Sequence, residues 1–333
     1  MTSSPHAEPV KRPPEHGDRR PGHDSDAQHG KDPLAFLIRV AEGNLAAQSE
    51  LFVASLREWG GAQAQTPVYA FTSPDDAPPR AIIDRLEQLG ATHVELGLEG
   101  KRRDPPVLNK VYVCAWAERE LDHPTLVFSD TDTVVLNEPR ELVEGEWIAA
   151  SKPVGSSRAG GSKGPEKRNE RYWQRMYSEL GVRSEPWVTS VVDRKRIRAY
   201  WNTGLVAARR EAGLFAAWEE ALERLYAKDV VFRKPVLMEQ LAWSAVTADH
   251  HDRVWELPDA YNYPLPKRRF LPEEMQALDL PEMTHVHLHK WAHLPGFLTE
   301  VQPPLDPTTD RYRWLAERLP LEPTIEGPFR WAD

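Results

Sequence analysis

The chain has 333 residues, of which 40% are hydrophobic and 28% charged, so it is long enough for one large α/β domain or two small ones. Its formal net charge of -9 at pH 7 argues against nucleic-acid or membrane-surface partners, because these attract clustered Lys and Arg. The single cysteine, Cys114, excludes an intrachain disulfide, and no apolar run reaches the roughly 20 residues of a transmembrane segment, so we expect a cytoplasmic protein.

The first half of the chain alternates between two kinds of apolar pattern. Residues 1–32 are rich in Pro, His, Gly and charge, and we expect them to form a disordered tail. Beyond them the pattern predicts strands at 35–40, 67–71 and 92–96, and helices at 44–59, 79–89 and 106–121. The stretch TLVFSDTDTVVL (125–136) then predicts a buried strand that runs into two aspartates and out again. This order of elements predicts a doubly wound α/β sheet, whose ligands lie at the carboxyl ends of the strands.

The second half is predicted to complete the same domain. The pattern indicates helices at 172–180, 214–226 and 236–246, and strands at 186–192, 201–208 and 283–289. After about residue 303 the chain is rich in proline and has one short predicted helix near 312–318. We therefore expect the domain to span residues 33–303, with residues 304–333 forming a C-terminal extension that packs on it.

Asp130 and Asp132 carry the strongest chemical signal. They are separated by one residue, so in an extended strand both carboxylates project to one side and can share a hard divalent cation. His285, His287 and His289 share one face of the predicted last strand by the same spacing. An imidazole from this strand would complete the protein ligands, with His287 preferred and His289 second.

These motifs resemble the GT-A glycosyltransferases, particularly glycosyltransferase family eight. The resemblance covers nearly the whole chain beyond the tail. It rests on the D-x-D at the end of a strand, on YWNTG (200–204) opening a later strand, on Glu239 followed by Gln240, on Tyr261 followed by Asn262, and on the histidine-rich HVHLHKW (285–291).

The resemblance implies a GT-A fold, with a Rossmann-like central mixed sheet flanked by helices, and transfer of a sugar from a nucleotide-diphosphate sugar to an acceptor that the sequence does not identify. It implies that Mn²⁺ or Mg²⁺ is bound by Asp130, Asp132 and His287 or His289. It also implies that Lys110, Asp130, Asn202 and Gly204 contact the donor. Asn202, Glu239 and Gln240 are the candidate catalytic residues, and retention of the anomeric configuration is expected.

Two departures from the family pattern and one competing motif leave alternatives to a glycosyltransferase open. The segment RVAEGNLAA after the first strand lacks the family's aspartate and aromatic residue for the nucleobase, and Glu239 stands where the family has Asp. The stretch SDTDTV also fits a haloacid-dehalogenase-type phosphatase with Asp130 as nucleophile, although its further acidic pair would have to come from Asp249 and Asp252 after a predicted helix. Besides a glycosyltransferase and a phosphatase, a non-catalytic nucleotide-sugar-binding protein is the third possibility.

Overall fold

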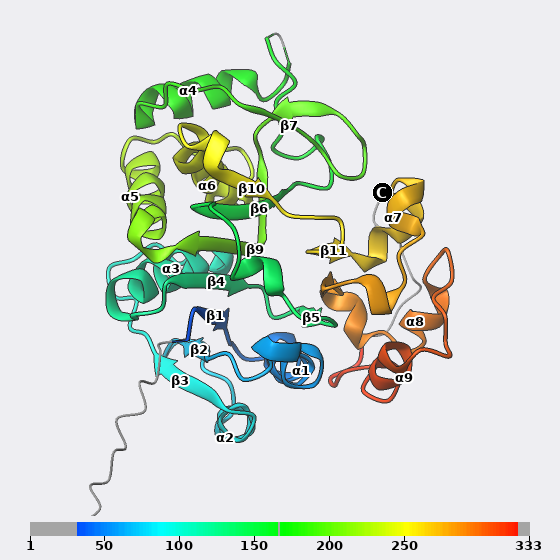
Figure 1. Cartoon of the computed structure of the whole chain (residues 1–333). Helices are drawn as coiled ribbons and strands as arrows, with labels where there is room; N and C mark the ends of the chain where they lie inside the picture. The colour runs from blue at the N-terminus through cyan, green and yellow to red at the C-terminus, as the bar shows by residue number, and fades with distance from the viewer. Residues whose placement is uncertain (1–31, 166, 326–333) are drawn as a thin grey trace, which may run out of the picture. The chain divides into compact units, whose positions relative to one another are not determined.

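The computed structural model describes residues 32–165 and 167–325 (Figure 1). The tail predicted at residues 1–32 lies outside the described residues except for Asp32, and so does the end of the C-terminal extension, residues 326–333.

The central element is a seven-stranded sheet in the order β10-β6-β9-β4-β1-β2-β3. Its strands are β1 (Leu34–Arg39), β2 (Val68–Thr72), β3 (Ala91–Glu95), β4 (Thr125–Ser129), β6 (Ala149–Pro153), β9 (Trp201–Arg209) and β10 (Val254–Glu256). Strands β1 to β4 are parallel, whereas β9 runs antiparallel to both β4 and β6. The sheet is therefore mixed, and the carboxyl ends of its parallel strands share one edge.

Alternation along β1 explains why helices cover both faces of the sheet. Ala35 and Leu37 pack into the core formed with α3, α4, α5 and α6, whereas Phe36 and Ile38 pack into the core formed with α1 and α2. These helices are α1 (Asn44–Trp59), α2 (Arg80–Gln88), α3 (Asn109–Glu120), α4 (Glu170–Leu180), α5 (Leu214–Ala227) and α6 (Met238–Ala248). Short 3₁₀ turns lead into α3 and α6, namely η2 (Pro106–Leu108) and η5 (Pro235–Leu237).

A second, three-stranded sheet lies beside the first in the order β11-β12-β5. Its strands are β5 (Thr133–Val135), β11 (Tyr263–Pro264) and β12 (His285–His287). The chain passes from β4 to β5 through only three residues, 130–132, so the D-x-D lies where it leaves one sheet and enters the other. The helices α7 (Glu273–Gln276), α8 (Phe297–Glu300) and α9 (Asp310–Ala316) surround this sheet, with the turn η9 (His289–His293) after β12.

The described part of the C-terminal extension contacts the rest of the chain through α9. Trp314 and Leu315 belong to the core of the smaller sheet, and the Trp314 ring meets that of Trp59 of α1 edge-on at 6.4 Å. Arg311 donates hydrogen bonds to the carbonyl of Leu136 and to Asn137 Oδ1.

The predicted mixed α/β architecture is confirmed, and two strand predictions need correction. The strand predicted at 283–289 covers only β12, because the backbone of His289 adopts a φ of 53° and begins η9. The strand predicted at 186–192 is the shorter β7 (Trp187–Thr189), which pairs with β8 (Arg196–Arg198) in a separate ribbon. In both places a turn interrupts an apolar alternation that continues in the sequence.

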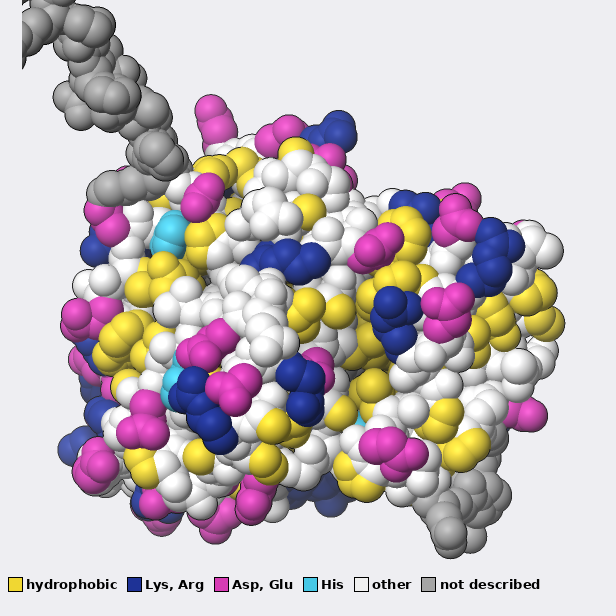
Figure 2. Space-filling model, turned by 90° about the horizontal axis from the view of Figure 1, so that it is seen from below, with side chains coloured by type: hydrophobic (Ala, Val, Ile, Leu, Met, Phe, Trp, Pro, Cys, Tyr) yellow, Lys and Arg dark blue, Asp and Glu magenta, His cyan; other side chains and the backbone are white. Residues whose placement is uncertain are grey.

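Within the described residues, no helix is both long enough and apolar enough to cross a membrane. On the face of the molecule shown in Figure 2, acidic and basic side chains are interspersed, with apolar side chains between them.

Candidate functional site

The site begins at the corner between β4 and β5, where the sequence predicted an extended D-x-D. Residues 130–132 form a bend, in which Thr133 Oγ1 donates a hydrogen bond to the Asp130 carbonyl at 2.6 Å. The two carboxylates therefore diverge. Asp130 faces α3, whereas Asp132 faces β12 and η9. The prediction that both project to one side of a strand was wrong, because the chain turns between the two sheets.

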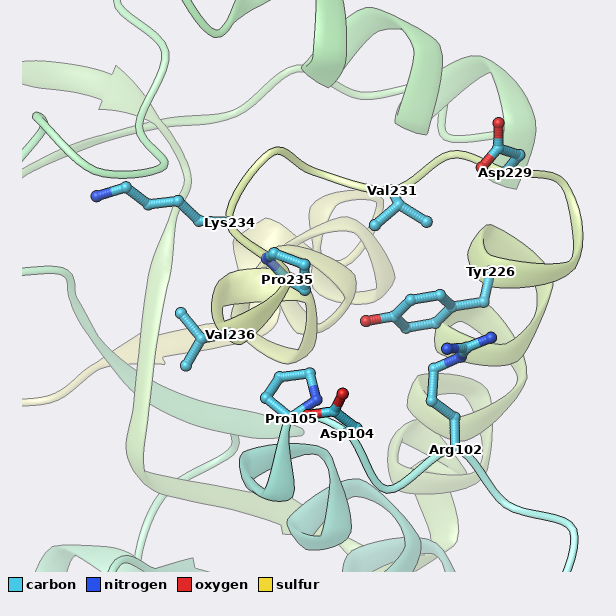
Figure 3. A pocket seen from close by; sticks show the side chains of 9 residues that line it. All are labelled: Arg102, Asp104, Pro105, Tyr226, Asp229, Val231, Lys234, Pro235 and Val236. Carbon is cyan, nitrogen blue, oxygen red and sulfur yellow. The ribbon is translucent and has the colours of Figure 1, made fainter.

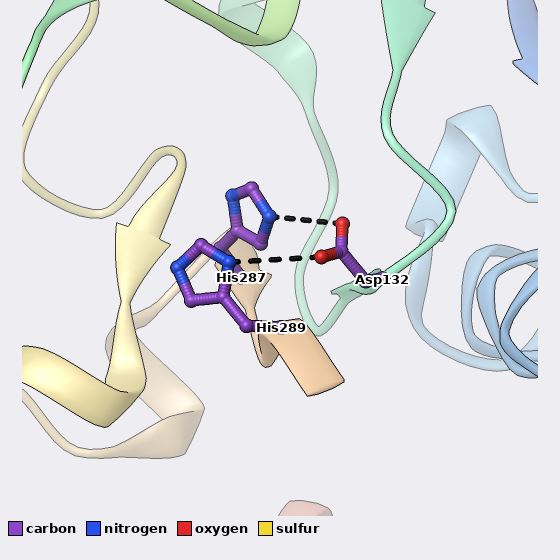
Figure 4. Close-up of side chains that lie close together, drawn as sticks. All are labelled: Asp132, His287 and His289. Atoms are coloured by element: carbon purple, nitrogen blue, oxygen red, sulfur yellow. Dashed lines mark ion pairs between the residues drawn. The ribbon is translucent and has the colours of Figure 1, made fainter. Parts of the chain in front are cut away.

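Asp132, His287 and His289 form a compact group, called here the Asp132 cluster (Figure 4). One ligand atom of each lies within 4.8 Å of those of the others. His287 Nε2 is 2.9 Å from Asp132 Oδ1, and His289 Nδ1 is 3.6 Å from Asp132 Oδ2. The backbone N–H groups of Leu288 and His289 also donate to the Asp132 carbonyl, which fixes the turn after β12 against the corner.

A chain of amides fixes the orientation of the His287 ring. Asn202 Oδ1 accepts two hydrogen bonds, one from the Gly204 N–H at 2.8 Å and one from Asn262 Nδ2 at 2.8 Å. Asn262 then presents its oxygen to His287 Nδ1 at 3.0 Å, so Nδ1 carries a proton and donates this hydrogen bond. The other nitrogen, Nε2, is left to face Asp132, as in metal sites where a second partner orients the ligating histidine.

Gly204 allows the close approach of strand β9 to this ring. A Cβ atom at position 204 would lie 2.8 Å from His287 Cε1 and 2.9 Å from Asn202 Oδ1. Real Cβ atoms do not approach other atoms this closely, so any larger residue would displace the imidazole or the amide. Asn202 and Gly204 thus support the Asp132 cluster.

Lys110 and Asp130 form a second charged group on the other side of the corner. Lys110 on α3 is only 5% exposed, and its Nζ is 2.6 Å from Asp130 Oδ1 and 3.2 Å from the Thr203 carbonyl. Burial opposes the charged form of Lys110, but Asp130 and Glu239 outweigh it and raise the pKa of Lys110. Asp130 therefore lies outside the Asp132 cluster, paired with an ammonium group.

Glu239 and Gln240 lie in the first turn of α6. Glu239 is fully buried and accepts a hydrogen bond from Thr203 Oγ1 at 2.5 Å. Burial raises its pKa to about 7, against the opposing effect of Lys110. Gln240 is half-buried beside it.

Within the Asp132 cluster, charge and burial act in opposite directions. Burial opposes ionisation of Asp132, but the charge of His287 outweighs it and holds the pKa of Asp132 well below its usual range. Asp132 in turn overcomes the burial of His287 and raises its pKa, whereas burial and His287 lower the pKa of His289. His285 points away to Ser129 Oγ, at 2.9 Å, and burial lowers its pKa to about 3. The spacing placed all three histidines on one face, but only His287 and His289 reach Asp132.

Two hollows meet at this corner. A cavity of about 280 Å³ is lined by Lys110, Asp130 and Asp132, and by residues that follow β1 and β2, including Leu45 and Asp76. A smaller one of about 50 Å³ has Lys152, Asn202, Asn262, His287 and His289 in its wall. The Asp132 cluster lies between them, at the carboxyl end of β4 where the topology predicts a ligand.

Two parts of this surface were not identified from the sequence. Arg39 pairs with Asp76 in the wall of the larger cavity, at the carboxyl ends of β1 and β2. The position of Asp76 after a parallel strand was the available signal. Lys152 is 2% exposed and donates to the carbonyls of Pro258, Asp259 and Tyr261 at 3.0–3.2 Å. No local pattern marks Lys152, because its partners come from a loop more than a hundred residues away.

Residues 36–249, more than half of the chain, match the model of the Rhodobacterales glycosyltransferase domain. The chain belongs to this glycosyltransferase family. No curated protein matches it. Three similar solved structures are the apo structure of the bifunctional glycosyltransferase WbbM, mouse xyloside xylosyltransferase 1 and the glycosyltransferase GlyE of Streptococcus pneumoniae TIGR4.

WbbM gives a TM-score of 0.51 at 13% identity, over 87% of this chain and 52% of WbbM. The xylosyltransferase gives 0.44 at 12% identity, over 76% of this chain and 97% of its own, and GlyE gives 0.45 at 15% identity, over 77% and 55%. At this identity the likeness to WbbM concerns the fold alone, and this glycosyltransferase chain spans about half the length of WbbM. The predicted GT-A fold class is confirmed.

Proposed function

We propose that the chain is a metal-dependent glycosyltransferase of the family-eight type, which transfers a sugar from a nucleotide-diphosphate sugar. The observation that carries this proposal is the Asp132 cluster at the carboxyl end of β4, within a chain of a glycosyltransferase family. A divalent cation held there would supply positive charge to the diphosphate, both in the bound donor and in the departing nucleoside diphosphate.

The donor set fits Mn²⁺ better than Mg²⁺, which prefers oxygen ligands. One carboxylate and two imidazoles converge within 4.8 Å, and Mn²⁺ accepts both oxygen and nitrogen ligands. The hydrogen bond that His287 Nδ1 donates to Asn262 Oδ1 holds Nε2 toward the cluster, as expected for a ligating imidazole. In this proposal Asp132, His287 and His289 would hold the cation, and Asp130 would be a further ligand when Lys110 pairs with the diphosphate instead.

The other residues named by the resemblance receive donor and sugar roles. Lys110 contributes a buried positive charge beside the larger cavity, where the diphosphate is proposed to lie. Asn202 and Gln240 offer neutral amides for sugar hydroxyls. Glu239 is proposed to lie beneath the transferred sugar. We infer retention, with the leaving diphosphate accepting the proton of the acceptor hydroxyl.

The phosphatase alternative receives no support from the acidic pair that it requires. Asp249 accepts hydrogen bonds from the N–H groups of Arg183 and Ser184, and Asp252 is exposed in a different hollow, beside Trp147 and Trp255. Neither is near Asp130 in the contacts of the described residues. A binding protein without turnover is distinguished from an enzyme by the assay below.

Calorimetry with ADP, CDP, GDP and UDP, with and without Mn²⁺, tests the proposal. Asp132→Asn should abolish Mn²⁺-dependent binding of the preferred nucleotide, because it removes the negative charge of the Asp132 cluster. Asp252→Asn removes the same charge at an exposed position and should bind normally.

Unchanged Mn²⁺-assisted binding in Asp132→Asn would remove the metal assignment. Incubation with the matching nucleotide sugar and NMR of the product would then show whether sugar is transferred and which anomer forms. Binding without release of sugar would make the chain a binding protein.

A further inference from the structure

A second cavity, of about 740 Å³, is shown in Figure 3, and Pro105 in its wall directly precedes the turn η2. It is formed by the loop before η2, the end of α5 and the segment that leads into α6. Its volume is within the range of small-molecule and cofactor sites. None of the residues assigned to donor or metal belongs to its wall.

The chain connects the walls of the two cavities at residues 104–107. Asp104 and Pro105 line the cavity of about 740 Å³, whereas the next residues, Pro106 and Val107, line the donor cavity. Lys234 to Val236 also line the cavity of about 740 Å³, and the chain continues from them into α6, which has Glu239 in its first turn. Because Pro105 and Pro106 are consecutive, the walls of the two cavities adjoin at the start of η2.

The charged groups of this cavity balance one another. Arg102 and Lys234 supply two positive charges, and Asp104 and Asp229 supply two negative charges. No ion pair of these four side chains is found among the described residues. Because the charges cancel, the cavity does not favour an anion or a cation, but it presents hydrogen-bond donors and acceptors to a neutral polar molecule.

Apolar surface lies between these charges. Figure 3 shows Pro105, Pro235 and Val236 on one side of the cavity and Tyr226 on the other, with Arg102 stacked on the tyrosine ring at 4.3 Å from its centroid. Val236 is 50% exposed and is one of three exposed large hydrophobic side chains among the described residues. A second one, Leu45, lines the donor cavity, so two of the three face a proposed ligand.

We infer that this cavity is a glycan-binding site that holds a neutral oligosaccharide, the acceptor chain, beside the donor. Sugar rings present apolar C–H faces and polar hydroxyl edges, which match alternating prolines, valine and charged groups without net charge. The inference rests on the proposed function for its role in transfer. Binding of the glycan itself requires neither metal nor nucleotide.

Saturation-transfer NMR of the full chain without metal, with maltotetraose, cellotetraose, chitotetraose and the anionic tetragalacturonate, tests the inference. We expect at least one neutral tetrasaccharide to bind. Val236→Arg should weaken it by about tenfold or more, because it fills the cavity and unbalances its charge. Asp104→Ala, at an exposed position, should weaken binding of the same tetrasaccharide.

Phe270→Arg is the matched control, since Phe270 is another exposed large hydrophobic side chain outside this cavity. It should bind glycan normally, and so should Asp132→Asn, whose defect concerns metal and nucleotide. Failure of glycan binding in Asp132→Asn would show that the glycan uses the metal site, contrary to the inference.

The inference is also overturned if no neutral tetrasaccharide binds, if only tetragalacturonate binds, or if Val236→Arg and Asp104→Ala leave binding unchanged. Calorimetry of Mn²⁺ and nucleotide on the same variants separates the two proposals. Normal nucleotide binding without glycan binding rejects this site alone, whereas glycan binding without nucleotide binding rejects the donor assignment alone.

Discussion

Glu239 is the residue whose ionisation depends most clearly on the fold. Its side chain is fully buried, Thr203 Oγ1 donates to one carboxylate oxygen, and the other, Oε1, has no hydrogen-bond partner among the described residues. Burial raises the pKa of Glu239 from 4.5 to about 7, with Lys110 opposing the shift. Between these values the folded chain holds a proton that the unfolded chain has lost. The stabilising effect is therefore complete below pH 4.5 and is lost as the pH rises through 7.

We predict that Glu239→Gln removes this pH dependence. The amide cannot ionise, and it keeps an oxygen for Thr203. Relative to wild type, the variant should gain on the order of 2–3 kcal/mol of unfolding free energy between pH 4.5 and pH 8, because each pKa unit corresponds to about 1.4 kcal/mol. Urea denaturation at several pH values measures this difference. Glu220→Gln, at an exposed position of α5, should follow wild type, and parallel curves for Glu239→Gln and wild type would contradict the prediction.

At the residue scale, the sequence named residues that lie close together in the fold, but it did not give their partners correctly. The resemblance named Asp132, His287 and His289, which the fold brings together. It also placed Asp130 with them, whereas Asp130 pairs with Lys110. Residue spacing could not distinguish these arrangements, because a bend and a strand fit the same alternation around the D-x-D.

At the scale of elements, the order of strands and helices was predictable from residue 33 to residue 136. Helix α1 is an example, because its bounds follow from Gly43 before it and Gly60 after it. The antiparallel direction of β9 was not predictable from its own sequence, since apolar periodicity carries no direction. The loop from Pro258 to Asn262 likewise has no local signal, yet it supports the orientation of His287.

Lys152 is the residue that holds this loop. It lies at an irregularity of β6 opposite Asn202, and its Nζ donates to the Tyr261 carbonyl at 3.0 Å, directly before Asn262. Burial lowers the pKa of Lys152 to about 8, although Asp259 opposes the shift. Asn262 adopts a φ of 45°, which is uncommon for a residue other than glycine, so its position depends on surrounding contacts. Lys152 is therefore a positioning residue that acts through Asn262.

We predict that Lys152→Met, which keeps much of the side-chain volume and removes the donor, weakens Mn²⁺ binding by about tenfold, as is typical when the partner of a ligating histidine is disturbed. Calorimetry with Mn²⁺ measures the effect. In Asn262→Ala the hydrogen bond between residue 262 and His287 is already lost, so adding Lys152→Met should weaken Mn²⁺ binding little further. A purely structural role would instead lower the unfolding free energy of Lys152→Met and leave its Mn²⁺ affinity unchanged.

At the scale of the whole molecule, the Asp132 cluster joins the two sheets. Asp132 belongs to the corner between β4 of the central sheet and β5 of the smaller one, whereas His287 belongs to β12 and His289 to the turn after it. The smaller sheet has its own core, which includes Val134, Val286 and Trp314 of α9. The C-terminal extension, proposed to begin at residue 304, thus stabilises the half of the site that carries the histidines.

We predict that Trp314→Ala destabilises the fold without altering the metal site itself. Trp314 is 8% exposed and packs against Trp59, and Trp→Ala changes in cores typically cost about 3–5 kcal/mol of unfolding free energy. Because none of its ring contacts involves the Asp132 cluster, Mn²⁺ with the preferred nucleoside diphosphate at about 100 times Kd should stabilise variant and wild type alike, by about 2.7 kcal/mol. Chemical denaturation with and without these ligands measures both quantities. Trp255→Ala, at a half-buried position of the edge strand β10, should cost less. If Trp314→Ala loses the ligand-dependent increment as well, the core of the smaller sheet sets the geometry of the Asp132 cluster, and the two halves of the site are more tightly coupled than their separate cores indicate.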